Sequence, residues 1–389
     1  MRVIIFMTQF YCLSGAERLA VELAEELNKR GIHTDILSMY TEDLPGVKEA
    51  KQELLARGIP NIYFLGMKIH PPVRSLFPAI FKLRRLIQKQ QYDIIETSMM
   101  SPSVIASWAT LLGNTRHVTG VHDVFRWERQ NLAQHKFWIF SLRCNRRNRY
   151  YTISEYVHDA WKNYSRISDR YGRIIYNGIP NDCFDAVSER HSVLKEFSIP
   201  DNGRIILYVG RLAKRKGCDT LLEALAPILD QHNLYLMYTG MLDPNVAGST
   251  QMLYDMQQQV EDEKLGHRVQ FVGYRKDIPR LMASTDLLVH PALIEGFGLV
   301  LAEAMAAGLQ VVASNVDGIP EVLESTDSIM VPPNDVHTLR DAVLKTLHHS
   351  PSEKSQAIEK GKKRAEKFRI CNRINNMVSL FQDILSGKF

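Results

Sequence analysis

The sequence predicts an α/β protein with two doubly wound, Rossmann-like domains. Short apolar runs alternate with segments of helical periodicity through almost all of the 389 residues. This alternation is typical of parallel sheets that are covered by helices on both faces. The runs form two series, and a chain of this length is expected to form two or three domains. We therefore expect one sheet in each half of the chain.

The first series begins with a buried strand over residues 3–7. Ala16, Leu19, Leu23 and Leu27 then recur at helical spacing, and Gly31 follows as a glycine cap. Further strands of this series are predicted over residues 33–39, 93–97, 117–120, 150–154 and 173–176.

A turn-rich stretch over residues 176–182 separates the two series. The second series has predicted strands over residues 205–209, 234–238, 269–272, 287–290, 310–313 and 328–331, and a last helix over 372–386. We therefore place an N-terminal domain at residues 1–178 and a C-terminal domain at residues 179–369.

Composition excludes several classes of protein. The formal net charge of +5 is too small to indicate nucleic-acid binding by itself. The five cysteines lie far apart without metal-ligand spacing, which predicts reduced thiols in a reducing compartment. Because no apolar run reaches 18 residues and the N-terminal run is too short for a signal peptide, we expect a cytoplasmic protein.

A glycine loop follows the predicted strand 287–290. It reads Glu295-Gly-Phe-Gly298 and leads into a helical pattern. The glycines let the backbone approach a ligand, and the amides of residues 297–299 would form an anion site at the helix N-terminus. We place Glu295 on the loop and Glu303 about one turn into the helix, where carboxylates suit paired sugar hydroxyls. Two solvated glutamates are the alternative.

A basic loop follows the predicted strand 205–209. Arg211, Lys214, Arg215 and Lys216 crowd a few positions before a helix and would repel one another without an anionic ligand. A diphosphate suits such a set, since arginine offers a fork of donors and lysine a point charge. A solvated basic loop is the alternative.

Two weaker signals lie in the first series. Gly15 follows Ser14 at the start of the first helix and could let a phosphate approach the amides, although a plain helix cap explains it equally well. It belongs to neither a dinucleotide fingerprint nor a P-loop. His122 follows a strand, where ligands bind in open α/β sheets, and a structural histidine is the equal alternative.

Together these residues resemble the retaining GT-B glycosyltransferases of family 4, over nearly the whole chain. The most specific matches are Glu295-Gly-Phe-Gly-Leu299 with Glu303, and Gly210-Arg-Leu212 with Lys216-Gly217. Supporting matches are Asn177-Gly178, Phe271-Val-Gly273 with Asp277, Ala313-Ser314, and Gly318-Ile-Pro-Glu321. The resemblance implies two Rossmann-like domains that face a cleft, with a C-terminal helix, about residues 370–389, returning to the N-terminal domain.

The resemblance also implies roles for individual residues. The residues implied in catalysis are His122, near the sugar ring, and Glu295, Arg211 and Lys216. Arg211 and Lys216 would hold the diphosphate and Gly15 would approach it, while Glu303 would bind the ribose. The donor sugar would meet Glu295, Gly296, Phe297, Gly298 and Leu299, and the base would lie between Tyr274 and Arg275.

The implied reaction is a retaining, metal-independent hexosyl transfer without a cofactor, the nucleotide sugar being a co-substrate. We expect a UDP-sugar donor, with a GDP-sugar as second choice, and a glycan or lipid-linked acceptor in bacterial cell-surface polysaccharide synthesis. The sequence contains no Asp-x-Asp metal motif, which agrees with a metal-independent reaction. We assign no glutamate nucleophile. A non-catalytic GT-B scaffold or partner-binding subunit is the alternative.

The sequence departs from the family pattern at several positions. Glu96 and Ser98 replace histidines that are common after that strand, so we expect both near the acceptor. Gln310 and Asp317 stand where proline and glycine are common, respectively.

Residues 65–149 are strongly basic, with fourteen cations, four anions and a local net charge of +10. Apolar residues such as Phe77, Phe81 and Phe140 lie among these charges. Such a surface can hold a protein on anionic lipid, which predicts peripheral contact with the inner face of the cell membrane. A solvated surface over core helices is the alternative. RNA binding is disfavoured because no aromatic and basic platform motif is present.

Overall fold

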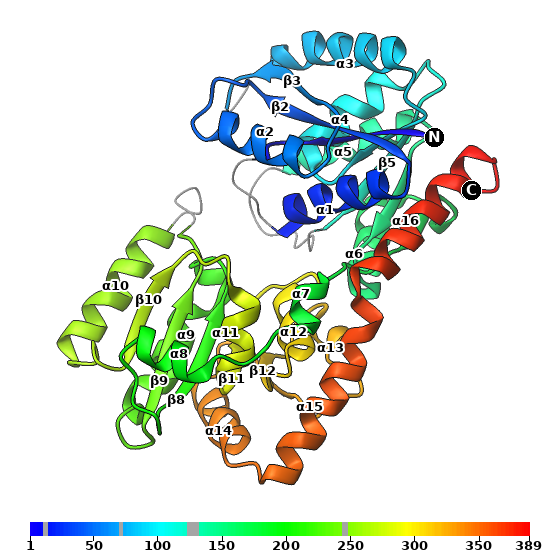
Figure 1. Ribbon diagram of the computed structural model, residues 1–389. Helices are drawn as coiled ribbons and strands as arrows, with labels where there is room; N and C mark the ends of the chain where they lie inside the picture. The colour runs from blue at the N-terminus through cyan, green and yellow to red at the C-terminus, as the bar shows by residue number, and fades with distance from the viewer. Residues whose placement is uncertain (11–14, 70–72, 123–131, 243–247) are drawn as a thin grey trace. The chain divides into compact units, whose positions relative to one another are not determined.

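The computed structural model describes residues 1–10, 15–69, 73–122, 132–242 and 248–389. The chain divides into two compact units (Figure 1). The N-terminal unit comprises Met1–Gly178 and Cys371–Phe389, and the C-terminal unit comprises Ile179–Ile370.

The N-terminal unit contains a seven-stranded sheet in the order β3-β2-β1-β4-β5-β6-β7, in which every pair is parallel. The chain moves outward from β1 in one direction and then returns to β4 to move in the other, so the strand order reverses between β1 and β4. The strands are β1 (Arg2–Met7), β2 (His33–Tyr40), β3 (Ile62–Met67), β4 (Ile94–Thr97), β5 (Arg116–Val121), β6 (Arg149–Thr152) and β7 (Gly172–Ile174).

The C-terminal unit repeats this plan with a six-stranded parallel sheet in the order β10-β9-β8-β11-β12-β13. Its strand order reverses between β8 and β11. The strands are β8 (Arg204–Val209), β9 (Leu234–Thr239), β10 (Val269–Gly273), β11 (Leu287–His290), β12 (Val311–Ser314) and β13 (Ile329–Val331). The prediction of two doubly wound α/β domains is therefore confirmed.

Helices cover both faces of each sheet because the parallel strands are joined by crossover connections. In the N-terminal unit, α3 and α4 bury Leu83, Ile87 and Ile105 against one face, and α1 lies on the other (Figure 1). This unit holds α1 (Gly15–Lys29), α2 (Val47–Ala56), α3 (Leu76–Gln90), α4 (Met100–Ala109), α5 (Leu132–Cys144) and α6 (Glu155–Ser165).

The C-terminal unit buries its core between the sheet and helices that include α9, α10 and α14. Leu221, Met256 and Val343 are among the apolar side chains that these helices contribute. Its helices are α7 (Asn181–Phe184), α8 (Arg190–Glu196), α9 (Cys218–Leu225), α10 (Ser249–Asp262), α11 (Ile278–Ser284), α12 (Leu299–Ala306), α13 (Ile319–Val322), α14 (Val336–Leu347) and α15 (Pro351–Ala365).

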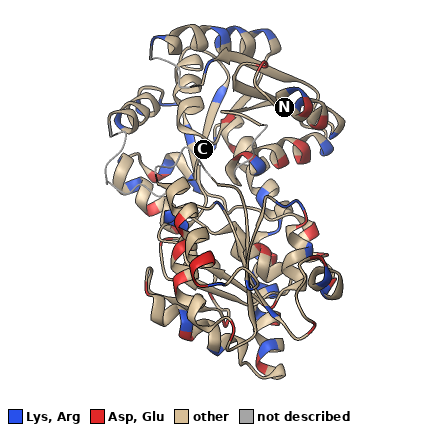
Figure 2. Cartoon of the chain, turned by 90° about the vertical axis from the view of Figure 1, so that its left-hand side faces the viewer, with Lys and Arg blue, Asp and Glu red and all other residues tan. Residues whose placement is uncertain are grey.

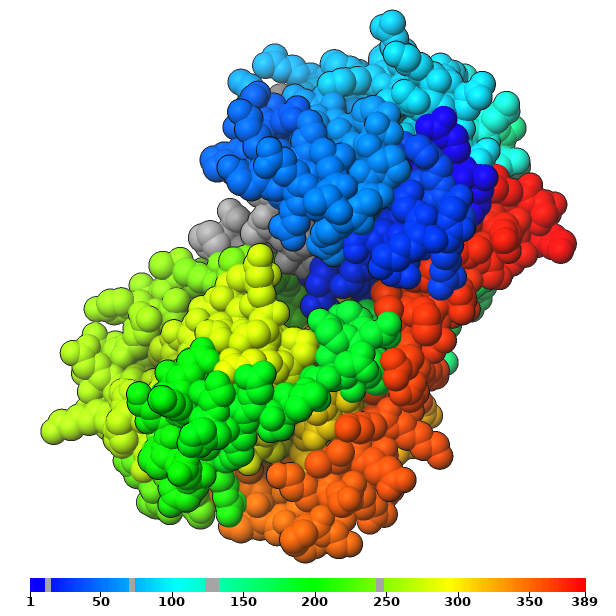
Figure 3. Space-filling model, viewed as in Figure 1, coloured from blue at the N-terminus to red at the C-terminus, as the bar shows by residue number. Residues whose placement is uncertain are grey.

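The last helix, α16 (Ile370–Leu385), belongs to the N-terminal unit although it follows the C-terminal one in sequence. Met377, Leu380 and Phe381 are fully buried on it. Asn375 accepts a 2.6 Å hydrogen bond from Arg30, and Asp383 pairs with Arg173 at 2.8 Å. Figure 3 shows this red helix against the blue N-terminal segment. The predicted return of the C-terminal helix is confirmed.

One strand of the N-terminal sheet was not predicted. The edge strand β3 pairs with β2 on one side only, and its burial does not follow a simple alternation. Its sequence, IYFLGM, is almost entirely apolar and aromatic, so a strand signal was present there, although the side chains are buried unevenly. Among the described residues, none of the helices has both the length and the apolar content required to cross a membrane.

Candidate functional site

The candidate site of the C-terminal unit lies where its strand order reverses. The loops that follow β8 and β11 leave the carboxyl ends of two paired strands, which is where open α/β sheets bind ligands. Both predicted motifs, the basic loop and the glycine loop, therefore arise side by side from one edge of the sheet.

The two loops are packed directly against each other. The backbone N–H of Leu293 donates to the carbonyl of Arg215 at 2.9 Å. Gly217 has a φ of 67°, and a Cβ atom there would lie 1.9 Å from the carbonyl oxygen of Pro291. Only glycine satisfies both the conformation and this close approach. The position of Lys216, just before Gly217, is thereby fixed relative to the glycine loop.

Lys216, Glu295 and His290 form a nearly buried cluster. The Lys216 Nζ donates to Glu295 Oε2 at 2.5 Å, and His290 Nε2 lies 3.0 Å from the same oxygen. The side chains of Lys216 and Glu295 are only 14% and 15% exposed, and that of His290 is 3% exposed. Since the carboxylate can only accept, Nε2 is the protonated nitrogen of His290.

The charge of Glu295 is stabilised by this cluster. Burial alone would raise the pKa of Glu295, but the Lys216 ammonium and the His290 hydrogen bond outweigh it and hold the pKa well below its usual range. The carboxylate therefore stays ionised at neutral pH and neutralises the ammonium beside it. The cluster thus holds a preformed, hydrogen-bonded carboxylate.

The glycine loop is anchored from behind. Phe297 is 1% exposed and packs edge-to-face on Phe368, with ring centroids 5.2 Å apart. The backbone N–H of Glu295 donates to Asp317 Oδ2 at 3.0 Å, and Asp317 has a φ of 50°. Its left-handed backbone explains why glycine is also suited to this position, while the carboxylate adds a contact that glycine lacks.

Helix α12 begins at Leu299, after Gly298 with a φ of 89°. The first turn of a helix leaves backbone N–H groups without intrahelical acceptors and carries the positive end of the helix dipole. Glu303 lies on the second turn and is buried. Glu295 is on the loop and Glu303 is on the helix, as predicted.

The other predicted donor-side residues differ in exposure. Arg211 is exposed, and its carbonyl accepts a 2.9 Å hydrogen bond from the Tyr208 hydroxyl. Tyr274 directly follows β10 and is 61% exposed. Arg275 makes a two-pronged ion pair with Asp277, both contacts at 2.8 Å, and also pairs with Glu196. These carboxylates fix the guanidinium of Arg275, and its aromatic neighbour Tyr274 remains accessible.

The N-terminal unit brings together three further predicted residues. Glu96 is the next-to-last residue of β4, Ser98 directly follows this strand, and His122 directly follows the neighbouring strand β5. Ser98 Oγ donates to Glu96 Oε1 at 2.8 Å. Tyr151, on β6, donates to the same oxygen at 2.8 Å and lies 3.4 Å from His122 Nε2. Glu96 and Ser98 are both buried.

Several site residues escaped the sequence reasoning. Tyr151 was recognised only as part of a strand, and Arg373, which donates to the Tyr151 hydroxyl oxygen at 3.5 Å, only as part of the last helix. His290 and Asp317 stood inside or beside recognised motifs, and their polarity next to the glycine loop was the available signal.

Gly15 is the first residue of α1 and is exposed. Ser14 and part of the basic region, including Arg126 and Arg129, lie outside the described residues.

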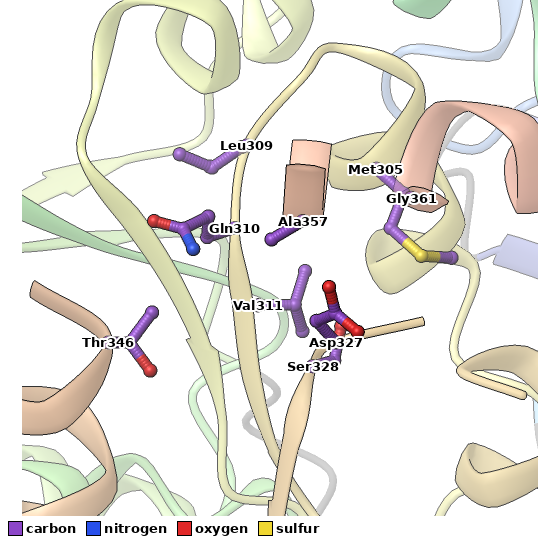
Figure 4. A pocket seen from close by; sticks show the side chains of 9 residues that line it. All are labelled: Met305, Leu309, Gln310, Val311, Asp327, Ser328, Thr346, Ala357 and Gly361. Atoms are coloured by element: carbon purple, nitrogen blue, oxygen red, sulfur yellow. The ribbon is translucent and has the colours of Figure 1, made fainter. Parts of the chain in front are cut away.

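A separate small pocket opens at the other edge of the same sheet (Figure 4). Gln310 and Ser328, which directly precede β12 and β13, line it together with Met305 and Gly361. Parallel strands begin at this edge and end at the opposite one, so the pocket lies away from the loops that hold Lys216 and Glu295.

Two family models match the chain. The model described as Glycosyltransferase Family 4 matches residues 13–182, and the one described as Glycosyl transferases group 1 matches residues 190–364. Together they cover most of both units. The second match contains the whole Lys216–Glu295 cluster, and the first contains Glu96, His122 and Tyr151.

Individual proteins agree with the family models. An uncharacterized glycosyltransferase of Methanocaldococcus jannaschii is 36% identical over 161 residues, which is 39% of this chain and 38% of that protein. The Escherichia coli UDP-Gal:alpha-D-GlcNAc-diphosphoundecaprenol alpha-1,3-galactosyltransferase is 24% identical over 80% of each chain. The Anabaena protein HepE, in a crystal structure with UDP and glucose, has a TM-score of 0.82 at 21% identity, covering 97% of this chain and 99% of its own. The chain has the GT-B fold and belongs to the family 4, or group 1, glycosyltransferases.

Proposed function

We propose that this protein transfers a hexose from a nucleotide-diphosphate donor to a glycan or lipid-linked acceptor. The observation that carries the proposal is the Lys216–Glu295 contact, which sets a cation and a carboxylate beside the N-terminus of α12. Support for a UDP-sugar comes from the UDP-Gal donor in the name of the E. coli relative and from the UDP complex of the Anabaena protein. A GDP-sugar is the second candidate.

The diphosphate is proposed to lie against Lys216, Arg211 and the first turn of α12. The amine and guanidinium supply charge-assisted hydrogen bonds, and the helix adds its N–H groups and dipole. During transfer the bond between the anomeric carbon and the diphosphate breaks, and negative charge grows on the leaving oxygen. Groups already aimed at that charge lower the barrier without the need for a metal.

The sugar is proposed to meet Glu295, whose second oxygen, Oε1, can accept hydrogen bonds from sugar hydroxyls. The acceptor oxygen forms the new bond on the face that the diphosphate leaves, and the hydroxyl proton passes to the departing diphosphate oxygen, so the anomeric configuration is retained. We assign no covalent glutamate intermediate. Glu303 on α12 suits the ribose hydroxyls, and the exposed ring of Tyr274, beside Arg275, suits the base.

A donor screen with product analysis tests this function. Purified protein is titrated with UDP-, GDP- and ADP-sugars and scored by concentration-dependent thermal stabilisation. The stabilising donor is then incubated with glycan and lipid-linked acceptors, with and without EDTA, and the product is examined by NMR for its anomeric configuration. We expect stabilisation by a UDP-sugar and a retained product in the presence of EDTA. Loss of transfer on chelation would contradict metal independence, and an inverted product would contradict retention.

A lipid-linked acceptor is favoured by one face of α3. Phe77 and Phe81 lie one turn apart and are 67% and 71% exposed, while Arg85 and Lys89 extend the same face. The helix carries four cations and no acidic residue. Figure 2 shows the predominance of basic residues on this uppermost helix. We propose that this α3 face docks on anionic lipid at the inner face of a bacterial membrane, where a polysaccharide precursor would be carried.

Vesicle co-sedimentation tests the docking. The wild-type protein is expected to sediment with anionic vesicles at low salt and not with neutral ones, since each cation near the surface contributes about 1 kcal/mol. The double change of Phe77→Ser and Phe81→Ser should abolish sedimentation. Tyr254→Ser on α10 removes a ring that is 59% exposed in the other unit and serves as the matched control. Equal binding of both variants would contradict the proposal.

A non-catalytic scaffold is the competing function. A scaffold requires no buried charge pair at the loop edge, and burying such a pair costs desolvation free energy. Complete absence of transfer, together with tight nucleotide-independent binding of a second protein, would favour the scaffold.

A further inference from the structure

The N-terminal unit contains a buried polar cluster at the carboxyl ends of β4, β5 and β6. The donor chemistry proposed above gives this cluster no role. It joins Glu96, His122, Tyr151 and Arg373, the last from α16. Glu96 and Tyr151 are fully buried, and Arg373 is 2% exposed. Buried polar groups are nearly always hydrogen-bonded, so the partners of each group indicate how the cluster is arranged.

The hydrogen bonds of Tyr151 determine which atoms of the cluster donate a proton and which accept one. Its hydroxyl lies 2.8 Å from Glu96 Oε1, which also accepts from Ser98 Oγ at 2.8 Å. Tyr151 therefore donates its single hydroxyl proton to Glu96. Any other partner of this oxygen has to donate to it.

Ser98 Oγ lies 3.3 Å from the Tyr151 hydroxyl oxygen, but its proton is donated to Glu96. Two nitrogens also lie near this oxygen. Arg373 Nη2 is 3.5 Å away and can only donate. His122 Nε2 is 3.4 Å away, with the two rings edge-to-face at 5.8 Å between centroids. Because Tyr151 has no second proton to give, Nε2 of His122 carries the proton. The other nitrogen, Nδ1, then retains its lone pair.

The same surroundings keep the imidazole neutral. Burial, and secondarily the charge of Arg373, lower the pKa of His122 to about 3. Arg373 is in turn held by Asn177, whose Oδ1 accepts from Nη1 at 3.2 Å. The fixed guanidinium thus both donates to Tyr151 and opposes a second positive charge nearby.

We propose that Tyr151, held by Glu96 and Arg373, is a positioning residue that fixes His122 as the Nε2-protonated tautomer, so that Nδ1 accepts a hydrogen bond from a sugar hydroxyl. The proposal rests on the sugar-transfer function above. Glycosyl transfer builds positive charge at the anomeric carbon, and a neutral acceptor beside the ring stabilises it where an imidazolium would oppose it.

A pair of neighbouring tyrosines on β6 provides the test. Tyr151→Phe removes the hydroxyl that orients His122 and keeps the ring. Tyr150→Phe is the matched control, because the Tyr150 hydroxyl is buried without a hydrogen-bond partner among the described residues. Glu96→Gln keeps an oxygen that can accept from Tyr151 and serves as the conservative variant.

Two readouts are combined. Long-range 1H–15N NMR of the histidine rings, with His122 assigned by its loss in His122→Asn, reports the tautomer directly. Wild type, Tyr150→Phe and Glu96→Gln should show a neutral, Nε2-protonated His122 at pH 7, whereas Tyr151→Phe should show a mixture of tautomers. The kcat of Tyr151→Phe should fall about five- to tenfold, with little change in the KM for the donor, as expected for one lost hydrogen bond.

Either of two results would overturn the positioning role. The first is an Nδ1-protonated or charged His122 in the wild type, and the second is a Tyr151→Phe variant with wild-type tautomer and kcat. The NMR measurement requires no sugar transfer. Failure of the wild-type chain to transfer sugar from any donor would instead overturn the proposed function, which separates the two failures.

Discussion

Lys216 Nζ and Glu295 Oε2 lie 2.5 Å apart although 79 residues separate them in the sequence. Their contact joins the loops after β8 and β11 into one site. Each loop is positioned by its own strand, and the backbone bond from Leu293 to Arg215 holds the loops together. The predictions below test the chemistry of this contact and of its surroundings.

Lys216→Ala is expected to weaken nucleotide-sugar binding by about ten- to a hundredfold, the range for one charge-assisted hydrogen bond. Lys214→Ala removes an exposed cation two positions away in the same loop and should change affinity far less. Isothermal titration with the donor identified in the screen measures both. Equal losses in the two variants would indicate only a diffuse attraction to the basic loop.

Glu303→Ala should remove recognition of the ribose. The wild-type protein is expected to bind UDP about tenfold more tightly than 2′,3′-dideoxy-UDP, because a carboxylate accepts strong hydrogen bonds from the two hydroxyls. The variant should bind the two nucleotides alike. A variant that still prefers UDP by the wild-type factor would show that Glu303 does not contact the ribose.

Glu295→Gln should lower kcat by about thirty- to a hundredfold and also make stability depend less on pH. The pKa of Glu295 is held below its ordinary value of 4.5, so ionisation stabilises the folded state above that pH. The variant should lose about 2–3 kcal/mol at pH 7. The difference from wild type should shrink as the pH falls below 4.5, because the Glu295 carboxylate then takes up a proton in the unfolded chain while it stays ionised in the folded one.

Denaturant unfolding followed by two signals measures this difference. All four tryptophans lie within residues 1–178, so their fluorescence follows the N-terminal unit. Circular dichroism follows both units, and the part of its transition that fluorescence does not share reports the C-terminal unit. A stability difference that stays constant from pH 7 to pH 3 would contradict the role of the ion pair.

Phe297→Ala should destabilise the C-terminal unit by about 3–5 kcal/mol, because it removes a buried ring and leaves a cavity. The loss of its contact with Phe368 should also loosen the loop that carries Glu295. Phe297→Leu is the milder control, with a smaller cavity. Stability is measured by the same two-signal unfolding, and equal stability of wild type and Phe297→Ala would contradict the anchoring role.

Local sequence patterns were sufficient for much of the C-terminal site. Strand β11, the glycines of residues 295–298 and the helical spacing that follows are all consecutive in sequence, and they place Glu295 and Glu303 on loop and helix. Edge strand β3 was missed although its sequence, IYFLGM, is a run of apolar and aromatic residues that is typical of strands. Glu96 was recognised as a departure from the family pattern, but its complete burial was not foreseen.

The sequence by itself determined the two α/β series, the basic and glycine loops, and the family to which they belong. These features depend on residues close together in the chain, where spacing alone indicates the structure. Only the tertiary structure decided that Lys216 neutralises Glu295 and that Arg373, 222 positions from Tyr151, completes the cluster around His122. Such contacts depend on strand order and on the docking of α16, and the periodicity of a single segment predicts neither.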